Sequence, residues 1–266
     1  MTGVSRYSII NPSILIGDRA LSDQLDAVRT EGFSAVELWW PFATPDPSVH
    51  EVDDVLRVLE AGGLGLIGLN SYEGGMAEGN RGIACWPDVD REFDASLEVC
   101  ARIVRETGAA NVNVLHGVRR SDEPVEVQDD RAARRTARAA ERLAGFGTAV
   151  TIEQLSHIPG YGLRTIDDVK AAVERARAYA ASGEILIQVD LFHMFQVGDD
   201  VERFFTDDWR DIGHVQVADA PGRGGPGTGE QPIDRLLDLL IAQGYDRRIA
   251  LEYSGYEGDD PFGWMR

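Results

Sequence analysis

The chain has 266 residues, of which 43% are hydrophobic, enough to bury one large core at the usual length of a single α/β barrel domain. Its formal net charge of −19 argues against a nucleic-acid partner, because nucleic acids are bound by clustered Lys and Arg side chains. Two cysteines, Cys85 and Cys100, are too few for a disulfide framework, and no apolar run approaches the roughly 18 residues of a membrane-spanning helix. With no signal-peptide pattern either, we expect a cytoplasmic protein that does not enter a membrane.

Patterns typical of strands and of helices alternate along the chain. Apolar runs that indicate buried strands lie at residues 8–16, 35–40, 64–70, 111–116, 149–153, 185–190, 214–219 and 249–253. Helical periodicity lies between them, at residues 18–31, 49–61, 90–107, 129–146, 166–181, 200–209 and 233–243. Residues 71–87 are too many and too rich in glycine for an ordinary connection, so we expect a functional loop there.

Eight alternating units predict a (β/α)8 TIM barrel, formed as a single domain by residues 1–266. An open, doubly wound sheet is the alternative fold. About fourteen residues follow Glu252, too few for a full outer helix with its loop, so we expect a short or incomplete eighth helix. The apolar edge that such a helix would leave uncovered predicts a homo-oligomer.

Four of the predicted strands carry, at or near their ends, a side chain with a metal-capable oxygen. These side chains are Glu153, Asp190, Gln216 and Glu252. The C-terminal ends of barrel strands share one mouth, so the oxygens should converge there and suit a hard divalent cation, Mg²⁺ or Mn²⁺. A lone acid after a strand is often only a helix cap, but Glu153 and Glu252 lie within or just after apolar runs, where a carboxylate must be paired or metal-bound.

Four further side chains are candidates for binding a substrate. His193 follows Asp190 by three residues and is placed to hydrogen-bond a substrate oxygen, although capping of the loop would also explain it. Arg223 follows the seventh strand in a glycine-rich loop, where its guanidinium fork suits a carboxylate and a solvated position is the alternative. Glu37, at the end of the second strand, is either an orienting acid or a paired one, and His116 either lines the pocket or is a satisfied core histidine.

Several segments together carry a resemblance to a known family. The most specific is GHVQVADAPGRGGPGTGE at residues 213–230, and others are IEQLSHIPGY at 152–161, DLFHM at 190–194 and GNRGIA at 79–84. In these segments the chain resembles the hydroxypyruvate isomerase family of the xylose-isomerase-like TIM barrels, and the resemblance spans nearly the whole chain.

The resemblance implies a ligand set and a proton-transfer pair. A divalent metal ion would be held by Glu153, Asp190, Gln216 and Glu252, and the two glutamates would also move the proton. One departure is the loop at residues 155–158, which is shorter than in the family and bears on which substrate is bound.

The residues and the resemblance favour a metal-dependent isomerase of a small hydroxy-oxo acid or sugar. Interconversion of hydroxypyruvate and tartronate semialdehyde passes through an enediolate, which a cation stabilises while Glu153 and Glu252 take and return the proton. A ketose 3-epimerase is the nearest alternative, although such enzymes usually carry His where this chain has Gln216. A zinc endonuclease would need a basic face and many more than the five histidines present. A non-catalytic binding barrel is the last alternative, and the four ligands argue against it.

Overall fold

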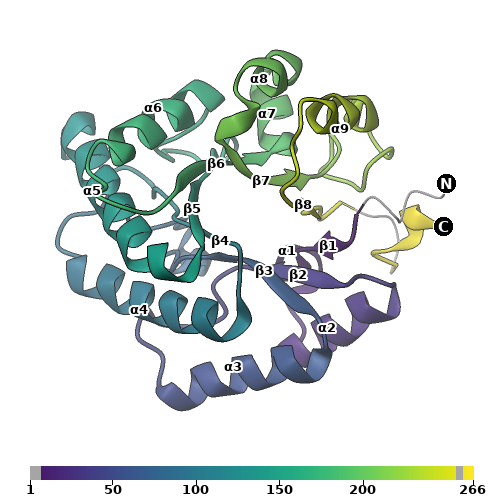
Figure 1. Ribbon diagram of the computed structural model, residues 1–266, viewed down its shortest axis with the longest axis horizontal. Coiled ribbons are helices and arrows are strands. Elements are labelled where there is room, and N and C mark those ends of the chain that lie inside the picture. Colours follow the sequence, from purple (N-terminus) through teal and green to yellow (C-terminus); the bar gives the residue numbers. More distant parts are fainter. Residues whose placement is uncertain (1–6, 256–259) are drawn as a thin grey trace.

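The computed structural model describes residues 7–255 and 260–266, which form a closed barrel of parallel strands surrounded by helices (Figure 1). The strands follow one another in chain order, and β1 closes the ring by pairing with both β2 and β8. The strands are β1 Ile9–Ile10, β2 Ala35–Leu38, β3 Gly65–Asn70, β4 Asn111–Asn113, β5 Ala149–Ile152, β6 Ile185–Asp190, β7 Ile212–Val217 and β8 Ile249–Leu251. The predicted (β/α)8 barrel is confirmed, and the open sheet is excluded.

Helices cover the outside of the barrel. They are α1 Pro12–Ile16, α2 Leu21–Thr30, α3 Val49–Gly62, α4 Asp90–Thr107, α5 Val125–Leu143, α6 Ile166–Arg177, α7 Leu191–Val197, α8 Val201–Asp207 and α9 Ile233–Ala242. Short 3₁₀ turns are η2 Met76–Glu78, η3 Ala144–Phe146, η4 Trp209–Asp211 and η5 Gly263–Met265. In the described part of the chain, none of these helices is long and apolar enough to cross a membrane.

The longer helices form where sequence signals for a start, an apolar face and an end agree. At the start of α3, Ser48 Oγ accepts a hydrogen bond from Glu51 N, and the Glu51 carboxylate accepts one from Ser48 N. The helix ends at Gly63, which has φ 66°. In α4, the buried side chains recur every three or four residues, which places them on one face toward the barrel.

The first apolar run is only partly a strand, so the predicted strand at residues 8–16 is wrong beyond Ile10. The helix α1 begins inside the run. Asn11 caps α1 by accepting a hydrogen bond from Ser13 N at 3.0 Å, and Pro12 takes the first helical position, where a missing N–H costs nothing. A short Ile and Leu run fits a buried strand or a buried helix equally well, so periodicity could not separate the two.

Other elements also differ from the prediction in their bounds. β4 ends at Asn113, earlier than predicted, and α5 begins at Val125 rather than at Asp129. An unpredicted helix, α7, follows β6 at once, because the Asp190 side chain caps it by accepting from Phe192 N at 2.9 Å. The strand-end acid therefore also starts a helix.

The barrel interior is apolar at its N-terminal end and polar toward its C-terminal end. At the N-terminal end of the barrel, Ile9, Ala35 and Ala250 pack with Ile67. Above them lies a layer of hydrogen-bonded polar side chains that includes Asn111, Thr151, Gln188, His214 and Glu37. Polar chemistry is therefore concentrated at the end of the barrel where TIM-barrel active sites form.

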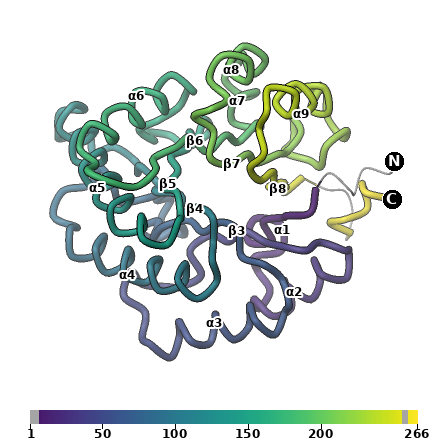
Figure 2. Tube along the Cα trace, viewed as in Figure 1, coloured from purple at the N-terminus to yellow at the C-terminus, as the bar shows by residue number. Residues whose placement is uncertain are grey.

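The chain after β8 forms no complete outer helix among its described residues. Residues 260–266 contain only the turn η5 and lie beside the N-terminal quarter of the chain (Figure 2). There the Phe262 ring lies 6.4 Å from that of Phe33, and Arg266 Nη2 lies 2.7 Å from Glu31 Oε1. The expected short or incomplete eighth helix is confirmed, and the homo-oligomer stays a prediction.

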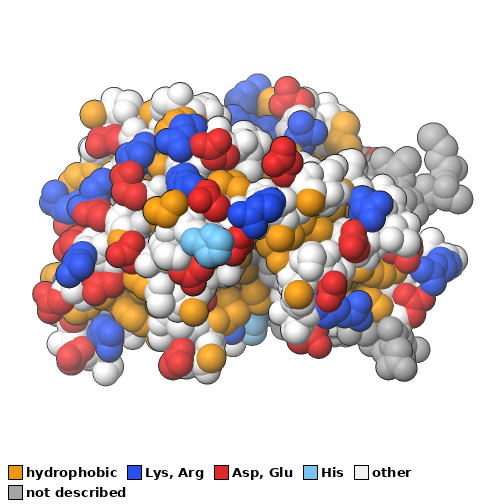
Figure 3. Space-filling view, turned by 90° about the horizontal axis from the view of Figure 1, so that it is seen from below, with side chains coloured by type: hydrophobic (Ala, Val, Ile, Leu, Met, Phe, Trp, Pro, Cys, Tyr) orange, Lys and Arg blue, Asp and Glu red, His pale blue; other side chains and the backbone are white. Residues whose placement is uncertain are grey.

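Charged side chains of both signs are interspersed on the molecular surface. On the face seen in Figure 3, Lys and Arg side chains lie among Asp and Glu side chains. Exposed ion pairs of the protein include Arg134 with Asp130 at 2.9 Å and Arg142 with Glu98 at 2.7 Å. Such exposed pairs typically contribute about 0–1 kcal/mol each, so the fold depends mainly on its packed core.

Candidate active site

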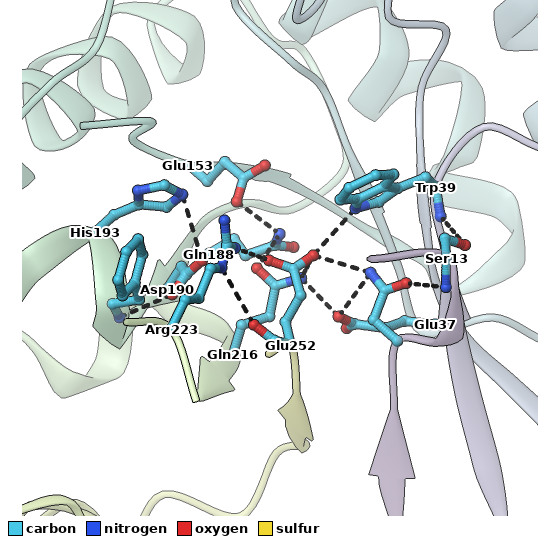
Figure 4. A network of polar contacts seen from close by, with 12 residues as sticks. Ser13, Glu37, Trp39, Glu153, Gln188, Asp190, His193, Gln216, Arg223 and Glu252 are labelled. Carbon is cyan, nitrogen blue, oxygen red and sulfur yellow. Dashed lines mark hydrogen bonds and ion pairs between the residues drawn. The ribbon is translucent and has the colours of Figure 1, made fainter. Parts of the chain in front are cut away.

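The ends of β5 to β8 bring the four predicted ligands into one group at the barrel mouth (Figure 4). Asp190 ends β6 and pairs in register with Gln216 of β7, while Glu153 and Glu252 directly follow β5 and β8. Each of the four residues is at most 4% exposed. The apolar strand residues before them are packed into the barrel wall, and this fixes the backbone from which the polar side chains project.

Glu252 is the most strongly held of these side chains. Its Oε1 accepts from Asn11 Nδ2 at 2.9 Å and from Gln216 Nε2 and Trp39 Nε1, both at 3.1 Å. Its Oε2 accepts from Arg223 Nη2 at 2.6 Å. The carboxylate is thus oriented from several sides, and turning it would break more than one buried hydrogen bond.

Glu153 faces Glu252 from the other side of the group and has fewer partners. Its Oε1 accepts from Asn113 Nδ2 at 2.7 Å, and its Oε2 accepts from Gln188 Nε2 at 3.2 Å. Burial, together with the nearby charge of Asp190, raises the pKa of Glu153 to about 8. Burial likewise raises the pKa of Asp190 and, to a greater extent, that of Glu252, although Arg223 opposes the change in both. The group holds more carboxylates than its positive charge can balance.

Arg223 bridges two of these carboxylates. Its Nη2 donates to Asp190 Oδ2 at 2.8 Å and to Glu252 Oε2 at 2.6 Å, as Figure 4 shows. Its backbone adopts φ 55°, which L residues rarely do, and the loop is held by Asp219, whose carboxylate accepts from the backbone N of Gly227 at 2.8 Å. The sequence predicted that the Arg223 guanidinium binds a substrate carboxylate. In the structure, Arg223 Nη2 lies between two carboxylates of the protein itself.

Gln216 is held from below by two neighbours. Its Nε2 donates to Glu37 Oε1 at 2.6 Å, and its Oε1 accepts from Gln188 Nε2 at 3.0 Å. Glu37 Oε2 in turn lies 2.5 Å from His214 Nε2. Glu37 therefore lies beneath the mouth, and its contacts fit both sequence-based interpretations, since it orients Gln216 and is paired with His214.

His193 joins the group from α7. Its Nε2 lies 3.4 Å from Asp190 Oδ2 and has no hydrogen-bond partner in the described chain, although it is fully buried. Its Nδ1 lies 3.0 Å from Ser156 Oγ, and its ring stacks on that of His157 with centres 4.9 Å apart. Ser156 and His157 belong to the loop that departs from the family pattern, so that departure lies directly against a predicted substrate residue.

His116 is not brought to the group, which runs against its prediction as a pocket residue. Its Nε2 lies 3.2 Å from Asp129 Oδ1 on α5, and its ring lines a different cavity together with Leu163 and Thr136. The preceding residue, Leu115, lines the barrel mouth instead. Neighbouring residues of an extended segment face opposite sides, so placing Leu115 inward turns His116 outward.

Several hydrogen-bond donors of the site were not predicted from the sequence. Asn113 and Gln188 hold Glu153, and Asn11 holds Glu252. Asn113 and Gln188 are polar residues inside runs otherwise typical of buried strands, and this irregularity was a usable signal. Asn11 carried no such signal beyond its position before Pro12.

A small cavity opens directly above the group. Its volume is about 80 Å³, and its walls are formed by Trp39, Asn70, Met76, Arg81, Leu115, Glu153, Leu155, His157, Ile158, His193, Arg223 and Glu252. Apolar walls with a few converging polar groups are typical of a site for a small molecule. Met76 and Arg81 come from the long glycine-rich segment between β3 and α4, so the predicted functional loop does reach the mouth.

The donor set suits a hard divalent cation. Three buried carboxylates and one carboxamide could supply oxygen ligands, and burial raises the pKa of all three carboxyl groups. Across residues 7–255 and 260–266, no three His, Cys, Asp or Glu side chains are already arranged around one point as ligands. Asp190 and Glu252 are each hydrogen-bonded to Arg223 Nη2, at 2.8 and 2.6 Å.

Comparison with known proteins assigns the family. A sequence profile described as the xylose isomerase-like TIM barrel matches residues 25–266. The chain belongs to this family. It is 35% identical to a protein of Streptomyces coelicolor that is provisionally named a hydroxypyruvate isomerase, over 96% of this chain and 94% of that one. It is 29% identical to a 2-oxo-tetronate isomerase of Cupriavidus necator, with 96% of each chain covered. The predicted resemblance and the predicted enzyme class, an isomerase, are confirmed.

A solved structure of the same architecture agrees with the fold. The crystal structure of an AP endonuclease, family 2, from Brucella melitensis matches this xylose isomerase-like chain with a TM-score of 0.85. The match covers 99% of this chain and 98% of that one at 22% sequence identity. At that identity the likeness shows a shared fold alone.

Proposed function

We propose that this xylose isomerase-like protein is a divalent-metal-dependent isomerase of a small hydroxy-oxo acid, as in the interconversion of hydroxypyruvate and tartronate semialdehyde. The observation that carries the proposal is the pair Glu153 and Glu252, buried after β5 and β8 with Asp190 and Gln216 on the strands between them. The names of the two relatives support this substrate class.

The four oxygen-bearing side chains would hold the cation. They are Glu153, Asp190, Gln216 and Glu252. When bound, a divalent cation supplies Lewis-acid stabilisation of the negative charge that develops on the substrate oxygens. A carboxylate has two oxygens, so each glutamate can give one to the cation and hold a proton on the other.

The chain itself supplies the proton transfer. Because β6 and β7 separate β5 from β8, the two glutamates approach a bound substrate from different sides. One removes a proton from the carbon next to the carbonyl and the other returns a proton to the carbonyl carbon, while the hydroxyl proton passes from one substrate oxygen to the other; this amounts to general acid–base catalysis. Asn113 and Gln188 orient Glu153, while Asn11 and Trp39 orient Glu252.

The surroundings keep water away and help to position the substrate. Trp39, Leu115 and Leu155 form walls of the cavity, and a closed apolar wall protects a reactive enediolate from side reactions. The buried Nε2 of His193 lacks a protein hydrogen bond, so it is free to bond a substrate oxygen.

The substrate class can be tested directly. With Mg²⁺ or Mn²⁺ present in D₂O, we expect the protein to convert hydroxypyruvate to tartronate semialdehyde and to incorporate solvent deuterium, both followed by proton NMR. Ketohexoses should remain unchanged under the same conditions. If a ketohexose were epimerised faster than any hydroxy-oxo acid, a ketose 3-epimerase would replace the proposed function.

The metal site has its own test. Crystals soaked in Mn²⁺ are expected to show one anomalous peak among Glu153, Asp190, Gln216 and Glu252, because these oxygens offer the hard donors that Mn²⁺ prefers. Crystals of an Asp190→Ala variant, soaked in the same way, are the control and should lose most of the peak. A peak elsewhere in the parent protein, or none, would contradict the assigned ligand set.

A further inference from the structure

Arg81 is a second guanidinium group at the barrel mouth, carried by the segment between β3 and α4. It lines the same cavity as Glu153, Glu252 and Arg223. Its Nη1 donates to two carbonyls of its own loop, Met76 O at 3.2 Å and Asn80 O at 2.6 Å. Within residues 7–255 and 260–266, its Nε and Nη2 donate no hydrogen bond, and it forms no ion pair with a carboxylate.

The loop holds Arg81 in place. Asn80 Nδ2 donates to Gly74 O at 2.7 Å, and Gly82 N donates to Glu73 O at 2.8 Å, so both neighbours of Arg81 are tied to the start of the loop. Gly82 has φ 105°, and a Cβ there would lie 2.3 Å from Leu115 O. Only glycine allows the loop to approach the end of β4 this closely, and the approach delivers Arg81 to the cavity.

The two arginines of the cavity differ in how many of their hydrogen-bond donors are unused. The Nη2 of Arg223 is already used by Asp190 and Glu252. Arg81 is half-buried, and burial lowers its pKa, with only the charge of Glu73 opposing. A partly desolvated guanidinium with unused donors is stabilised by an anion that brings its own carboxylate.

We infer that Arg81 binds the carboxylate of the substrate and makes this site prefer a hydroxy-oxo acid to a neutral sugar. The inference rests on the proposed function and identifies the residue that sets its substrate class. A cavity of about 80 Å³ accommodates a short substrate, so one end lies between the glutamates while the other remains near the cavity wall. Arg223 then holds the carboxylates of Asp190 and Glu252, and Arg81 binds the carboxylate of the substrate.

The test compares a charged substrate with its neutral counterpart. Dihydroxyacetone differs from hydroxypyruvate by a CH₂OH group in place of the carboxylate. For Arg81→Ala, we expect the KM for hydroxypyruvate to rise on the order of 10- to 100-fold, the range of a charge-assisted hydrogen bond, while deuterium exchange into dihydroxyacetone stays at the parental rate. Arg81→Lys should recover only part of the loss, because a point charge does not replace the fork.

A binding experiment separates recognition from chemistry. By calorimetry, the parent protein should bind D-glycerate more tightly than glycerol, and Arg81→Ala should remove that difference. Arg120→Ala is the matched control, since it also removes one positive charge from an adjoining loop, where Arg120 lies exposed over the Trp86 ring. It should leave both measurements unchanged.

The outcomes distinguish failure of this inference from failure of the proposed function. If the parent isomerises hydroxypyruvate and Arg81→Ala keeps the parental KM, the inference is overturned and the function stands. If Arg81→Ala loses acid and neutral substrates equally, Arg81 only shapes the loop, and the inference is again overturned. If the parent acts on no hydroxy-oxo acid, the proposed function fails and the inference fails with it.

Discussion

Replacing Glu153 or Glu252 with Gln is expected to nearly abolish the exchange of solvent deuterium into the substrate. A carboxamide keeps the size of the side chain and an oxygen ligand, but it cannot accept the proton. General acid–base assistance of this kind is typically worth roughly 10²–10⁴-fold in rate, and each variant should lose about that much. The measurement is the initial exchange rate of hydroxypyruvate in D₂O by proton NMR.

Two controls make this result specific to proton transfer. Glu174→Gln, on the exposed face of α6, should keep the parental rate. Mn²⁺ affinity should fall less than the rate does in Glu153→Gln and Glu252→Gln, because an amide oxygen still binds the ion. A variant that exchanges deuterium at the parental rate would show that its glutamate is only a ligand.

Replacing Arg223 with Ala should impair catalysis and weaken the fold together. Arg223 Nη2 lies between Asp190 and Glu252, so the substitution leaves two buried carboxylates without the guanidinium that pairs with them. Removing one partner from a buried ion pair costs roughly 3–5 kcal/mol. We expect the free energy of unfolding of the metal-free protein to decrease by an amount near the lower end of that range. Urea denaturation in the presence of EDTA measures the change.

The catalytic part of the same prediction concerns substrate charge. Arg223→Ala should lower kcat/KM for hydroxypyruvate and for dihydroxyacetone alike, on the order of 100-fold, because misplaced carboxylates harm both reactions. Arg235→Ala is the control for stability, since Arg235 pairs with Glu202 at the exposed surface, and its denaturation midpoint should not move. If kcat/KM fell only for hydroxypyruvate, Arg223 and not Arg81 would be the residue that binds the substrate carboxylate.

The positions of the candidate ligands at the strand ends could be predicted because their signal is local. Glu153 and Glu252 directly follow buried, mainly apolar strands, and such strands form the barrel wall whatever the outer helices do. Asp190 is likewise visible as the last residue of a buried strand. Parallel pairing in chain order then places all of these ends at one mouth.

Other features of the site depend on contacts that no single segment contains. His116 was assigned to the mouth from its position after an apolar run, but an extended chain faces alternate sides, and whether position 115 or 116 faces inward is decided by tertiary packing. The partners of Arg223 were not foreseeable either, because they come from β6 and from the end of β8, 33 and 29 residues away in the chain. Spacing alone cannot give such long-range contacts.

The first turn of α1 restricts which residue can stand at position 11. Asn11 Oδ1 accepts from Ser13 N at the start of α1, while its Nδ2 donates to Glu252 Oε1. Aspartate would cap α1 equally well but would turn a second anion toward the glutamate, and serine or threonine would have to perform both tasks with one oxygen. Of the side chains favoured at a helix start, only the carboxamide divides acceptor and donor between two atoms. Substitution at this position is therefore restricted both by the start of α1 and by the hydrogen bond to Glu252.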